Sequence, residues 1–148
     1  MSIKVLELHH HGIRIDPTAD AVSEARRFYV DVLGIPVDSK RPDIPGVPGL
    51  WLDVGDGPQS AQIHLMGATG RSPSALSDNE DPTIPHVALA VEDIVEARRE
   101  LDTQGVSYWQ IDGLVGADSQ QVFLRDPFGN MIELHQIGTC RCNQAARE

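Results

Sequence analysis

Two stretches of the chain repeat the same order of apolar and polar positions. Each begins with an alternating segment, at 10–15 and at 86–91, and continues with apolar residues at helical spacing, a glycine and a second extended stretch. Each copy closes with a short alternating segment, at 63–65 and at 132–134. Alternation is typical of strands, and spacings of three and four are typical of helices. The pattern predicts a repeated unit of a strand, a helix and three further strands, which is an α+β fold.

The same spacing sets the expected bounds of each element. We expect strands at about 3–15, 48–54, 60–66, 84–91, 106–111, 120–125 and 131–136, with a weaker strand near 35–40 that prolines interrupt. A linker rich in Ser, Asp, Pro and Gly at 68–84 separates a first module at 1–67 from a second at 85–137, and a polar tail at 138–148 follows. The 148 residues fit one compact domain.

Apolar residues at helical spacing identify the buried side of each expected helix. In the first helix these residues are Val22, Ala25, Tyr29, Val32 and Leu33, before a terminating Gly34. The second helix is expected to begin after Asp93 as N-cap, with Glu96 as its capping-box partner. Its buried residues are Ile94, Ala97 and Leu101, before a terminating Gly105.

Strand alternation separates two faces at four equivalent places in the repeat. Large aliphatic residues occupy one face, which the two amphipathic helices should cover. The opposite face should line a cleft, and it carries His10, His64, His86 and Glu133. A single histidine in a strand is more often a surface or hydrogen-bonded residue, but three imidazoles and a carboxylate at equivalent positions form a typical set of metal ligands. The sequence therefore predicts one divalent-metal site.

The other three histidines are assigned by the same alternation. His9 and His11 should point away from His10, which indicates structural roles for both. His135 shares the face of Glu133 and could either support the ligands or face a substrate.

Composition narrows the classes of function. The formal charge is −10, from 12 Lys and Arg against 22 Asp and Glu, and an acidic surface repels the phosphate backbone of nucleic acids. No apolar run reaches the roughly 18 residues of a membrane-spanning helix, and the first residues lack the apolar segment of a signal peptide, so we expect a cytoplasmic protein. Cys140 and Cys142 lack a second pair that would complete a zinc site, and we expect no role for them.

The motifs resemble those of the vicinal oxygen chelate superfamily, which includes glyoxalase I, methylmalonyl-CoA epimerase, extradiol dioxygenases, and fosfomycin and bleomycin resistance proteins. The resemblance covers about residues 5–137. It is carried by His10-x-Gly-Ile-Arg-Ile, Phe28-Tyr-x-x-Val-Leu-Gly, His86-Val-Ala-Leu-Ala-Val and the run from Phe123 to Leu134. The resemblance implies two βαβββ modules in a cupped mixed sheet, with helices on the convex face. It also implies that His10, His64, His86 and Glu133 hold one metal ion.

Further roles follow from the resemblance. Arg14 lies where glyoxalase I holds an arginine that binds a substrate carboxylate, and a salt bridge at the rim is the alternative. Glyoxalase I usually has a carboxylate where this chain has His64, which leaves Glu133 as the one ligand able to act as a base. Members of the superfamily often form dimers, so the site could close within one chain or across a homodimer. Two aromatic residues, Trp51 and Phe123, could stack on a flat substrate, as could Phe128, or pack in the core.

Three functions remain open at this point. The first is a lyase or isomerase that binds vicinal oxygens of a small carbonyl substrate on Zn, Ni, Mn, Co or Fe and stabilises an enediolate, with Glu133 shuttling a proton. The second is an Fe(II) ring-cleaving dioxygenase, in which His64 would fill a coordination position that the reaction needs open. The third is a metal-free drug-binding protein, against which the full ligand set argues. We rank the lyase or isomerase first.

Overall fold

Strands form where the alternating segments predict them. The computed structural model describes residues 2–56 and 60–139, so Cys140 and Cys142 lie outside the described residues. The strands are β1 (Val5–Ile15), β2 (Gly49–Val54), β3 (Ala61–Gly67), β4 (His86–Val91), β5 (Tyr108–Asp112), β6 (Gln120–Arg125) and β7 (Met131–Gln136). Each lies within a few residues of its expected bounds. The weaker strand near 35–40 is reduced to one bridge between Val37 and Leu52, beside a proline that cannot donate to a ladder.

The second helix, α2 (Ile94–Thr103), has the predicted N-cap. The Asp93 carboxylate accepts hydrogen bonds from the backbone N–H groups of Val95 and Glu96, at 2.9 and 3.1 Å. The side chain of Glu96 contacts Arg99. The predicted buried residues of this helix, Ile94, Ala97 and Leu101, are all buried.

The first helix departs from the predicted pattern in its last turns. α1 (Ala19–Arg26) continues directly into a π-helical segment, η1 (Arg27–Val32). Because π-helical bonds join residues five apart, later side chains are rotated away from the positions that an α-helix gives them. Val30 therefore packs against the sheet, whereas Val32 and Leu33 are 68% and 52% exposed. The prediction that Val32 and Leu33 are buried is wrong.

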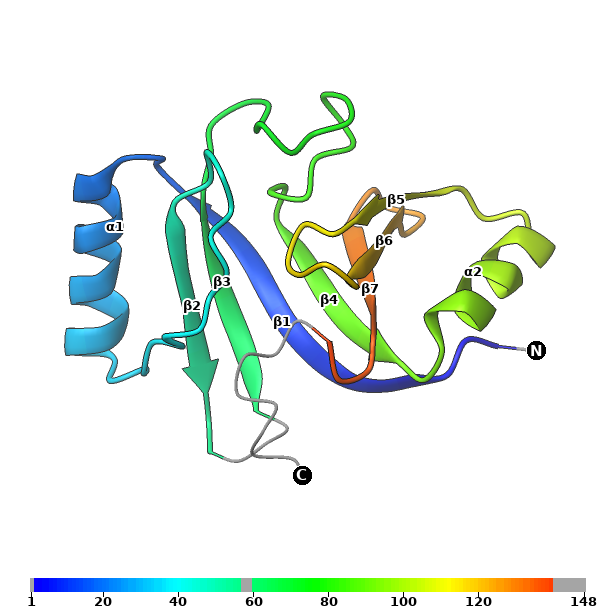
Figure 1. The fold of residues 1–148 in the computed structure, drawn as a ribbon, viewed down its shortest axis with the longest axis horizontal. Coiled ribbons are helices and arrows are strands. Elements are labelled where there is room, and N and C mark those ends of the chain that lie inside the picture. Colours follow the sequence, from blue (N-terminus) through cyan, green and yellow to red (C-terminus); the bar gives the residue numbers. More distant parts are fainter. Residues whose placement is uncertain (1, 57–59, 140–148) are drawn as a thin grey trace.

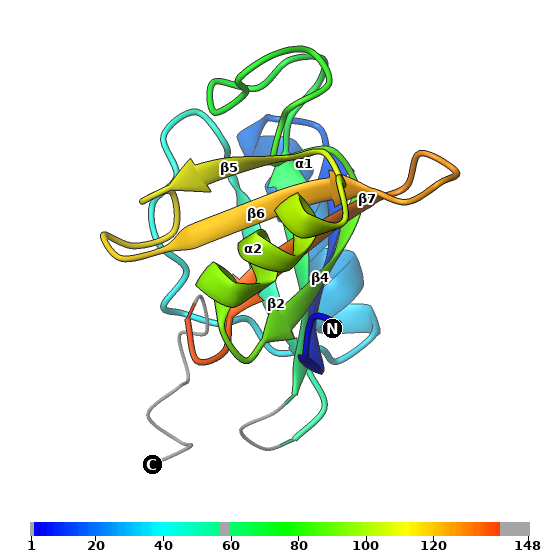
Figure 2. The same ribbon diagram turned by 90° about the vertical axis from the view of Figure 1, so that its right-hand side faces the viewer.

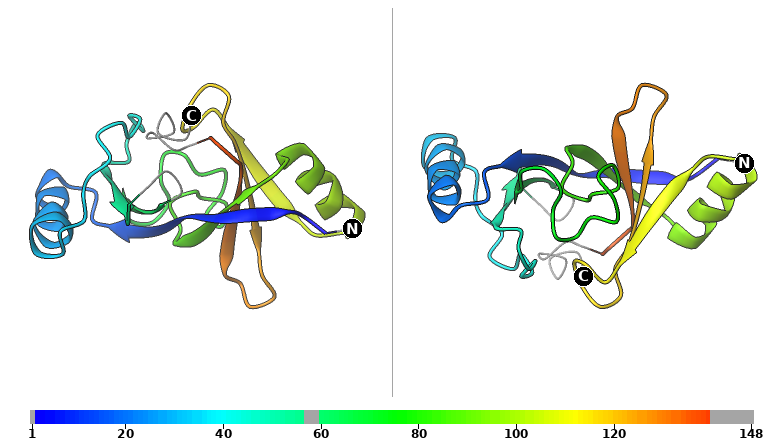
Figure 3. Two further views of the ribbon diagram at one scale, coloured as in Figure 1. Left: turned by 90° about the horizontal axis from the view of Figure 1, so that it is seen from below. Right: turned by 90° about the horizontal axis from the view of Figure 1, so that it is seen from above.

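The seven strands form one open, mixed sheet in the order β2-β3-β1-β4-β7-β6-β5. β1 pairs in parallel with β3, β4 pairs in parallel with β7, and the antiparallel pair β1–β4 joins the two modules. Figure 1 shows α1 and α2 at opposite ends of the sheet, and the turned views in Figures 2 and 3 show the strands of the two modules running in different directions on either side of this junction. The predicted α+β fold is confirmed, although the first module has two strands after its helix where three were predicted.

Each helix covers a separate apolar cluster. Under α1 the buried residues are Leu50, Leu52 and Leu65. Under α2 they are Val91, Ile94, Ala97, Leu101, Val122 and Leu134. The large aliphatic residues thus lie on the helix side, as predicted, and the opposite face is free to hold polar side chains. No helix among residues 2–56 and 60–139 has both the length and the apolar character needed to cross a membrane.

Candidate metal centre

Two rows of paired residues cross the sheet and place the candidate ligands side by side. In one row His10 pairs with Ala88, and Ala88 pairs with Glu133. In the other row Gly12 pairs with both His64 and His86. Side chains in neighbouring rows on one face are within reach of each other. The small side chains at 12 and 88 leave the space that the larger polar groups occupy.

Three of the four predicted ligands converge on one point. The His10 Nε2 and His86 Nε2 atoms are 3.2 Å apart. Each of them lies 3.0 Å from the same oxygen, Oε2 of Glu133. All three side chains are at least 96% buried, and all three come from one chain.

This triangle has the size of a metal-ligand set. Metal–ligand bonds of about 2.1 Å place neighbouring ligand atoms about 3.0 Å apart at right angles and about 3.4 Å apart in a tetrahedron. Glu133 Oε2 is buried and has no hydrogen-bond partner among the described residues. A buried oxygen that no N–H group satisfies is costly, and a cation at the centre of the triangle would satisfy it. The residues present therefore fit a divalent metal held by two histidines and one carboxylate.

Burial and neighbouring groups set the charges of the triad. Burial alone would raise the pKa of Glu133, but His135 and His10 outweigh it and hold this pKa well below its usual range. Burial lowers the pKa of His10 to about 4, against the opposing attraction of Glu133. Burial also lowers the pKa of His86, but Glu133 and the Ile84 carbonyl outweigh it, so the net shift is upward. The site therefore offers an anionic oxygen and a neutral His10 to a cation.

His64 lies beside the triad but does not join the triangle. Its ring stacks between those of Trp51 and His10, with centroid distances of 4.1 and 3.7 Å. Its Nε2 atom is 2.8 Å from the side-chain oxygen of Gln62. The Gln62 amide nitrogen donates to Asp38 and Asp53, which fixes the Gln62 oxygen as the acceptor of the His64 Nε2–H group.

In a neutral His64, these contacts place the hydrogen on Nε2 and the lone pair on Nδ1. Burial, and then the neighbouring His10, lower the pKa of His64 well below its usual value, so the ring is neutral. Gln62 was not among the predicted site residues, although it shares a face with His64 two positions away.

Two further side chains contact the other oxygen of Glu133. Gln121 on β6 donates to Oε1, and His135 Nε2 lies 2.9 Å from the same oxygen without hydrogen-bond geometry. His135 is fully buried and does not line the pocket, so it lies behind the ligand and does not face a substrate. Gln121 was not among the predicted site residues, although it shares a face of β6 with Phe123, two positions away.

Strand alternation predicts the wrong side of β1 for one histidine. His11 is exposed, which agrees with the prediction that it points away from His10. His9 is instead buried beside His10, with 2.7 Å between their Nδ1 atoms. The reason is a shift in the pairing of β1 with β4: Leu8 pairs with Leu89, and His10 pairs with Ala88, so His9 is an extra residue. Such a bulge redirects side chains, and the prediction that His9 points away from His10 is wrong.

A pocket opens in front of the triad. The lining includes His10, His64, His86, Glu133, Trp51 and Gln121 from the sheet. Pro82 and Thr83 join them from the segment between β3 and β4, residues 68–85. Its volume is about 40 Å³, a few times the roughly 10–15 Å³ that one water needs by the same measure. The pocket thus suits a small group.

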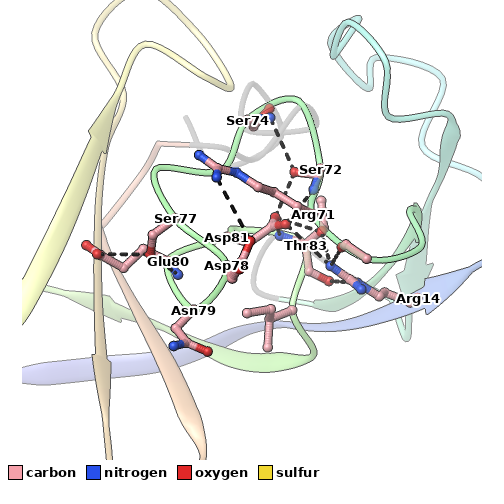
Figure 4. Close-up of polar contacts among 12 residues, drawn as sticks. Arg14, Arg71, Ser72, Ser74, Ser77, Asp78, Asn79, Glu80, Asp81 and Thr83 are labelled. Atoms are coloured by element: carbon pink, nitrogen blue, oxygen red, sulfur yellow. Dashed lines mark hydrogen bonds and ion pairs between the residues drawn. The ribbon is translucent and has the colours of Figure 1, made fainter.

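The structure gives Arg14 partners other than a substrate carboxylate. Its guanidinium donates to the backbone oxygens of Thr83 and Gly70, at 3.1 and 2.8 Å, and to the Thr83 hydroxyl, at 2.8 Å. It also lies 3.4 Å from Asp81. Figure 4 shows Arg14 beside Thr83 and Asp81, and these contacts tie β1 to the segment between β3 and β4, residues 68–85. Arg14 is not among the residues that line the pocket, so the geometry supports the alternative of a structural salt bridge.

The three aromatic residues differ in their surroundings. Trp51 lines the pocket, where its ring is stacked on His64. Phe123 is fully buried and stacks on Trp109, which indicates core packing. Phe128 is 89% exposed in the turn before β7, so it contributes to neither the core nor the pocket.

Several solved structures are similar to this chain. Methylmalonyl-CoA epimerase from Mycobacterium tuberculosis is 26% identical, with a TM-score of 0.64, over 92% of this chain and 90% of that one. A single-residue variant of Streptomyces coelicolor methylmalonyl-CoA epimerase, in complex with 2-nitronate-propionyl-CoA, is 18% identical, with a TM-score of 0.65, over 90% and 95% of the two chains.

A dioxygenase shares the fold as well. The 2,3-dioxygenase LapB from Pseudomonas sp. KL28 is 18% identical, with a TM-score of 0.63, over 92% of this chain but 42% of that one. None of the curated proteins matches the sequence. The sequence model of the Glyoxalase/Bleomycin resistance protein/Dioxygenase superfamily matches residues 8–134. Because the match spans most of the sequence, the chain belongs to this superfamily.

Proposed function

We propose that the protein is a divalent-metal-dependent enzyme of the lyase or isomerase type, acting on a small carbonyl compound with adjacent oxygens. The observation that carries the proposal is the triangle of His10 Nε2, His86 Nε2 and Glu133 Oε2, with sides of 3.0 to 3.2 Å. The proposed ligands are these three residues, and Zn, Ni, Mn, Co and Fe all accept such a set. When bound, the metal would supply Lewis acidity that stabilises the negative charge of an enediolate.

The residues around the triad suit proton transfer next to a carbonyl group. Glu133 is held on one oxygen by Gln121 and faces the ligand triangle with the other, so we assign it to metal binding. His64 is neutral, lines the pocket and retains a lone pair on Nδ1. We therefore propose His64 as the proton acceptor, in place of the Glu133 expected from the sequence. Gln62 would hold the ring of this base in one orientation.

Similarity to the epimerase favours this class of reaction. The likeness to the Mycobacterium tuberculosis enzyme extends over nearly the full length of both chains, and epimerisation at a carbon next to a carbonyl begins with removal of a proton. The small pocket also fits the reacting end of a substrate better than a bulky ring system.

The test is metal-dependent exchange of a substrate proton. The protein would be loaded in turn with each candidate metal, and deuterium uptake next to the carbonyl of hydroxycarbonyls, 2-oxo acids and branched acyl thioesters would be followed by NMR. We expect exchange with at least one compound, and a loss of about 100-fold or more in a His64→Gln variant that still binds metal. If no compound exchanges at any metal, the proposal is abandoned.

The same variant separates two roles of His64. If His64→Gln loses metal affinity together with exchange, then His64 is the fourth ligand that the sequence predicted. If affinity is retained, His64 acts on the substrate.

A second candidate is an Fe(II) ring-cleaving dioxygenase. It is favoured by the number of converging ligands, because a triad of two histidines and one carboxylate leaves coordination positions for a catecholate and dioxygen. The shared fold with LapB is compatible with this reaction. Oxygen uptake with a panel of catechols by the Fe(II)-loaded protein, together with no deuterium exchange, would favour this candidate over the first.

A further inference from the structure

His9 is built into the back of the candidate metal centre, although it does not line the pocket. It is 1% exposed, and it is the extra residue of the bulge in β1. The ring of His135 packs against it with a centroid distance of 4.9 Å and an interplanar angle of 26°. Bulges are common beside functional sites, where they redirect a side chain.

The contacts of His9 form a chain that ends at His10. His9 Nε2 lies 3.3 Å from the backbone oxygen of Thr139, and His9 Nδ1 lies 2.7 Å from His10 Nδ1. A carbonyl oxygen can only accept, so His9 Nε2 carries the hydrogen. A neutral imidazole has one N–H group, so His9 Nδ1 has the lone pair and accepts from the N–H group of His10 Nδ1.

We infer that His9 is a positioning residue that sets the tautomer of His10, so that the lone pair of His10 Nε2 faces the ligand triangle. The inference rests on the metal site of the proposed function. This tautomer suits metal binding, because His10 Nε2 lies 3.0 Å from Glu133 Oε2 without making a hydrogen bond to it. With the hydrogen on Nδ1, both atoms keep a lone pair for a cation.

His86 has the same arrangement with a backbone acceptor. Its Nδ1 atom lies 2.7 Å from the Ile84 carbonyl oxygen, which places the lone pair of the neutral ring on Nε2. Partners of this kind raise the basicity of a ligand and fix its ring. In His10 the acceptor is a side chain, so its contribution can be removed by substitution.

The three rings His9, His10 and His135 could instead hold an ion of their own, since their nitrogens lie within 4.8 Å of one another. No carboxylate belongs to this group, and all three side chains are buried. The carboxylate beside two of these rings, Glu133, already belongs to the ligand triangle. A second dication among the neutral rings would have no carboxylate ligand of its own, and burying it would be costly. The hydrogen-bonded chain therefore explains the contacts better, and metal stoichiometry distinguishes the two.

The experiment compares three variants of the full chain. His9→Phe removes the acceptor, His9→Asn keeps an oxygen near the position of Nδ1, and His11→Phe makes the same change at the exposed neighbouring histidine. Zinc affinity would be measured by competition with a chelator. We expect His9→Phe to weaken zinc binding by about 10- to 100-fold, His9→Asn to restore most of the loss, and His11→Phe to match the wild type.

Nitrogen NMR of histidine-labelled wild type gives a readout that needs no variant to fold. We expect hydrogen on His10 Nδ1 and on His9 Nε2, both before and after zinc is added. The opposite tautomers in the metal-free protein, or equal zinc affinity in all three variants, would overturn the inference. So would two zinc ions per wild-type chain with one lost in His9→Phe. If the wild type binds no metal, it is the proposed function that fails.

Discussion

Glu133 and the surrounding histidines share one buried cluster, in which each charge depends on the others. Burial lowers the pKa of His10 to about 4 and holds that of His64 well below its usual value. In the unfolded chain both histidines would take up protons near pH 6.5. Between these pH values the unfolded state binds more protons than the folded state, so the free energy of unfolding falls as pH falls.

The metal-free protein should therefore lose stability between about pH 6.5 and pH 4. For His10 alone the loss is on the order of 3 kcal/mol over this range. The raised pKa of His86 acts in the opposite direction but mainly above pH 6.5, where the folded state keeps a proton that the unfolded state has lost. Urea unfolding of chelator-treated protein at several pH values measures the slope, and His10→Asn should flatten it. An equal slope in the variant would contradict this assignment.

At the residue scale, the repeat in the sequence predicted the three residues of the triad but not the contacts around them. His10, His86 and Glu133 stand at equivalent positions of two modules, so their common face could be inferred from alternation. His9 could not be placed in this way, because a bulge shifts the pairing and strand periodicity does not reveal it. The partners of Arg14 depend on how the 68–85 segment folds back, which no local pattern specifies.

Among the elements, β1 approaches its neighbours closely at Gly12. A Cβ atom at this position would lie 2.7 Å from Cε1 of His86 and 2.9 Å from the terminal carbon of Met66. Met66 is flexible, but the His86 ring is held by the Ile84 carbonyl. We expect Gly12→Ala to displace this ring and to weaken zinc binding by about 10-fold or more, without removing a ligand. His11→Ala, on the same strand, is the control, and calorimetric titration with zinc is the measurement.

The 68–85 segment is anchored by one buried carboxylate. Asp81 accepts hydrogen bonds from the backbone N–H groups of Ser72 and Thr83, at 2.7 and 2.9 Å, and from both of their hydroxyls, at 2.7 and 2.8 Å. Figure 4 shows that these contacts and Arg14 meet at one place. Pro82 and Thr83 line the pocket, so this anchor also shapes the pocket wall.

Removing the anchor should loosen the segment. Asp81→Ala leaves several buried donors without an acceptor, and we expect a loss of about 3 kcal/mol in the free energy of unfolding. Asp78→Ala is the matched control in the same segment, because the Asp78 side chain is 86% exposed, and its effect should stay within about 0.5 kcal/mol. Limited proteolysis should cleave the Asp81 variant faster within 68–85. Equal cleavage of both variants would argue against the anchor.

The bounds of the elements were largely predictable, and the exceptions have physical causes. All seven strands and α2 follow from periodicity, turn residues and the Asp93 cap. The π-helical segment at Arg27–Val32 could not be predicted in this way. The apolar residues at 22, 25 and 29 have the spacing of an ordinary α-helix. The exposure of Val32 and Leu33 follows from this one difference.

On the scale of the whole molecule, the triad spans the junction of the two modules. His10 comes from the first module, and His86 and Glu133 come from the second, across the β1–β4 pair. We therefore expect zinc affinity to be independent of protein concentration, since the ligands meet within one chain. Titrations of dilute and concentrated protein, with the oligomeric state followed by sedimentation, test this. A dependence on concentration would mean that a second copy completes the site.

The position of the triad across this junction also has a consequence for the timing of folding. Its members lie on the first, fourth and seventh strands, so the ion would cross-link segments that are far apart in sequence. Contacts between segments far apart in sequence are slow to form, so we expect the complete centre only when all three strands have paired. During refolding, tight zinc binding should therefore appear only with the final kinetic phase. The rate at which the refolding protein takes zinc from a chelator would then report when the sheet is complete.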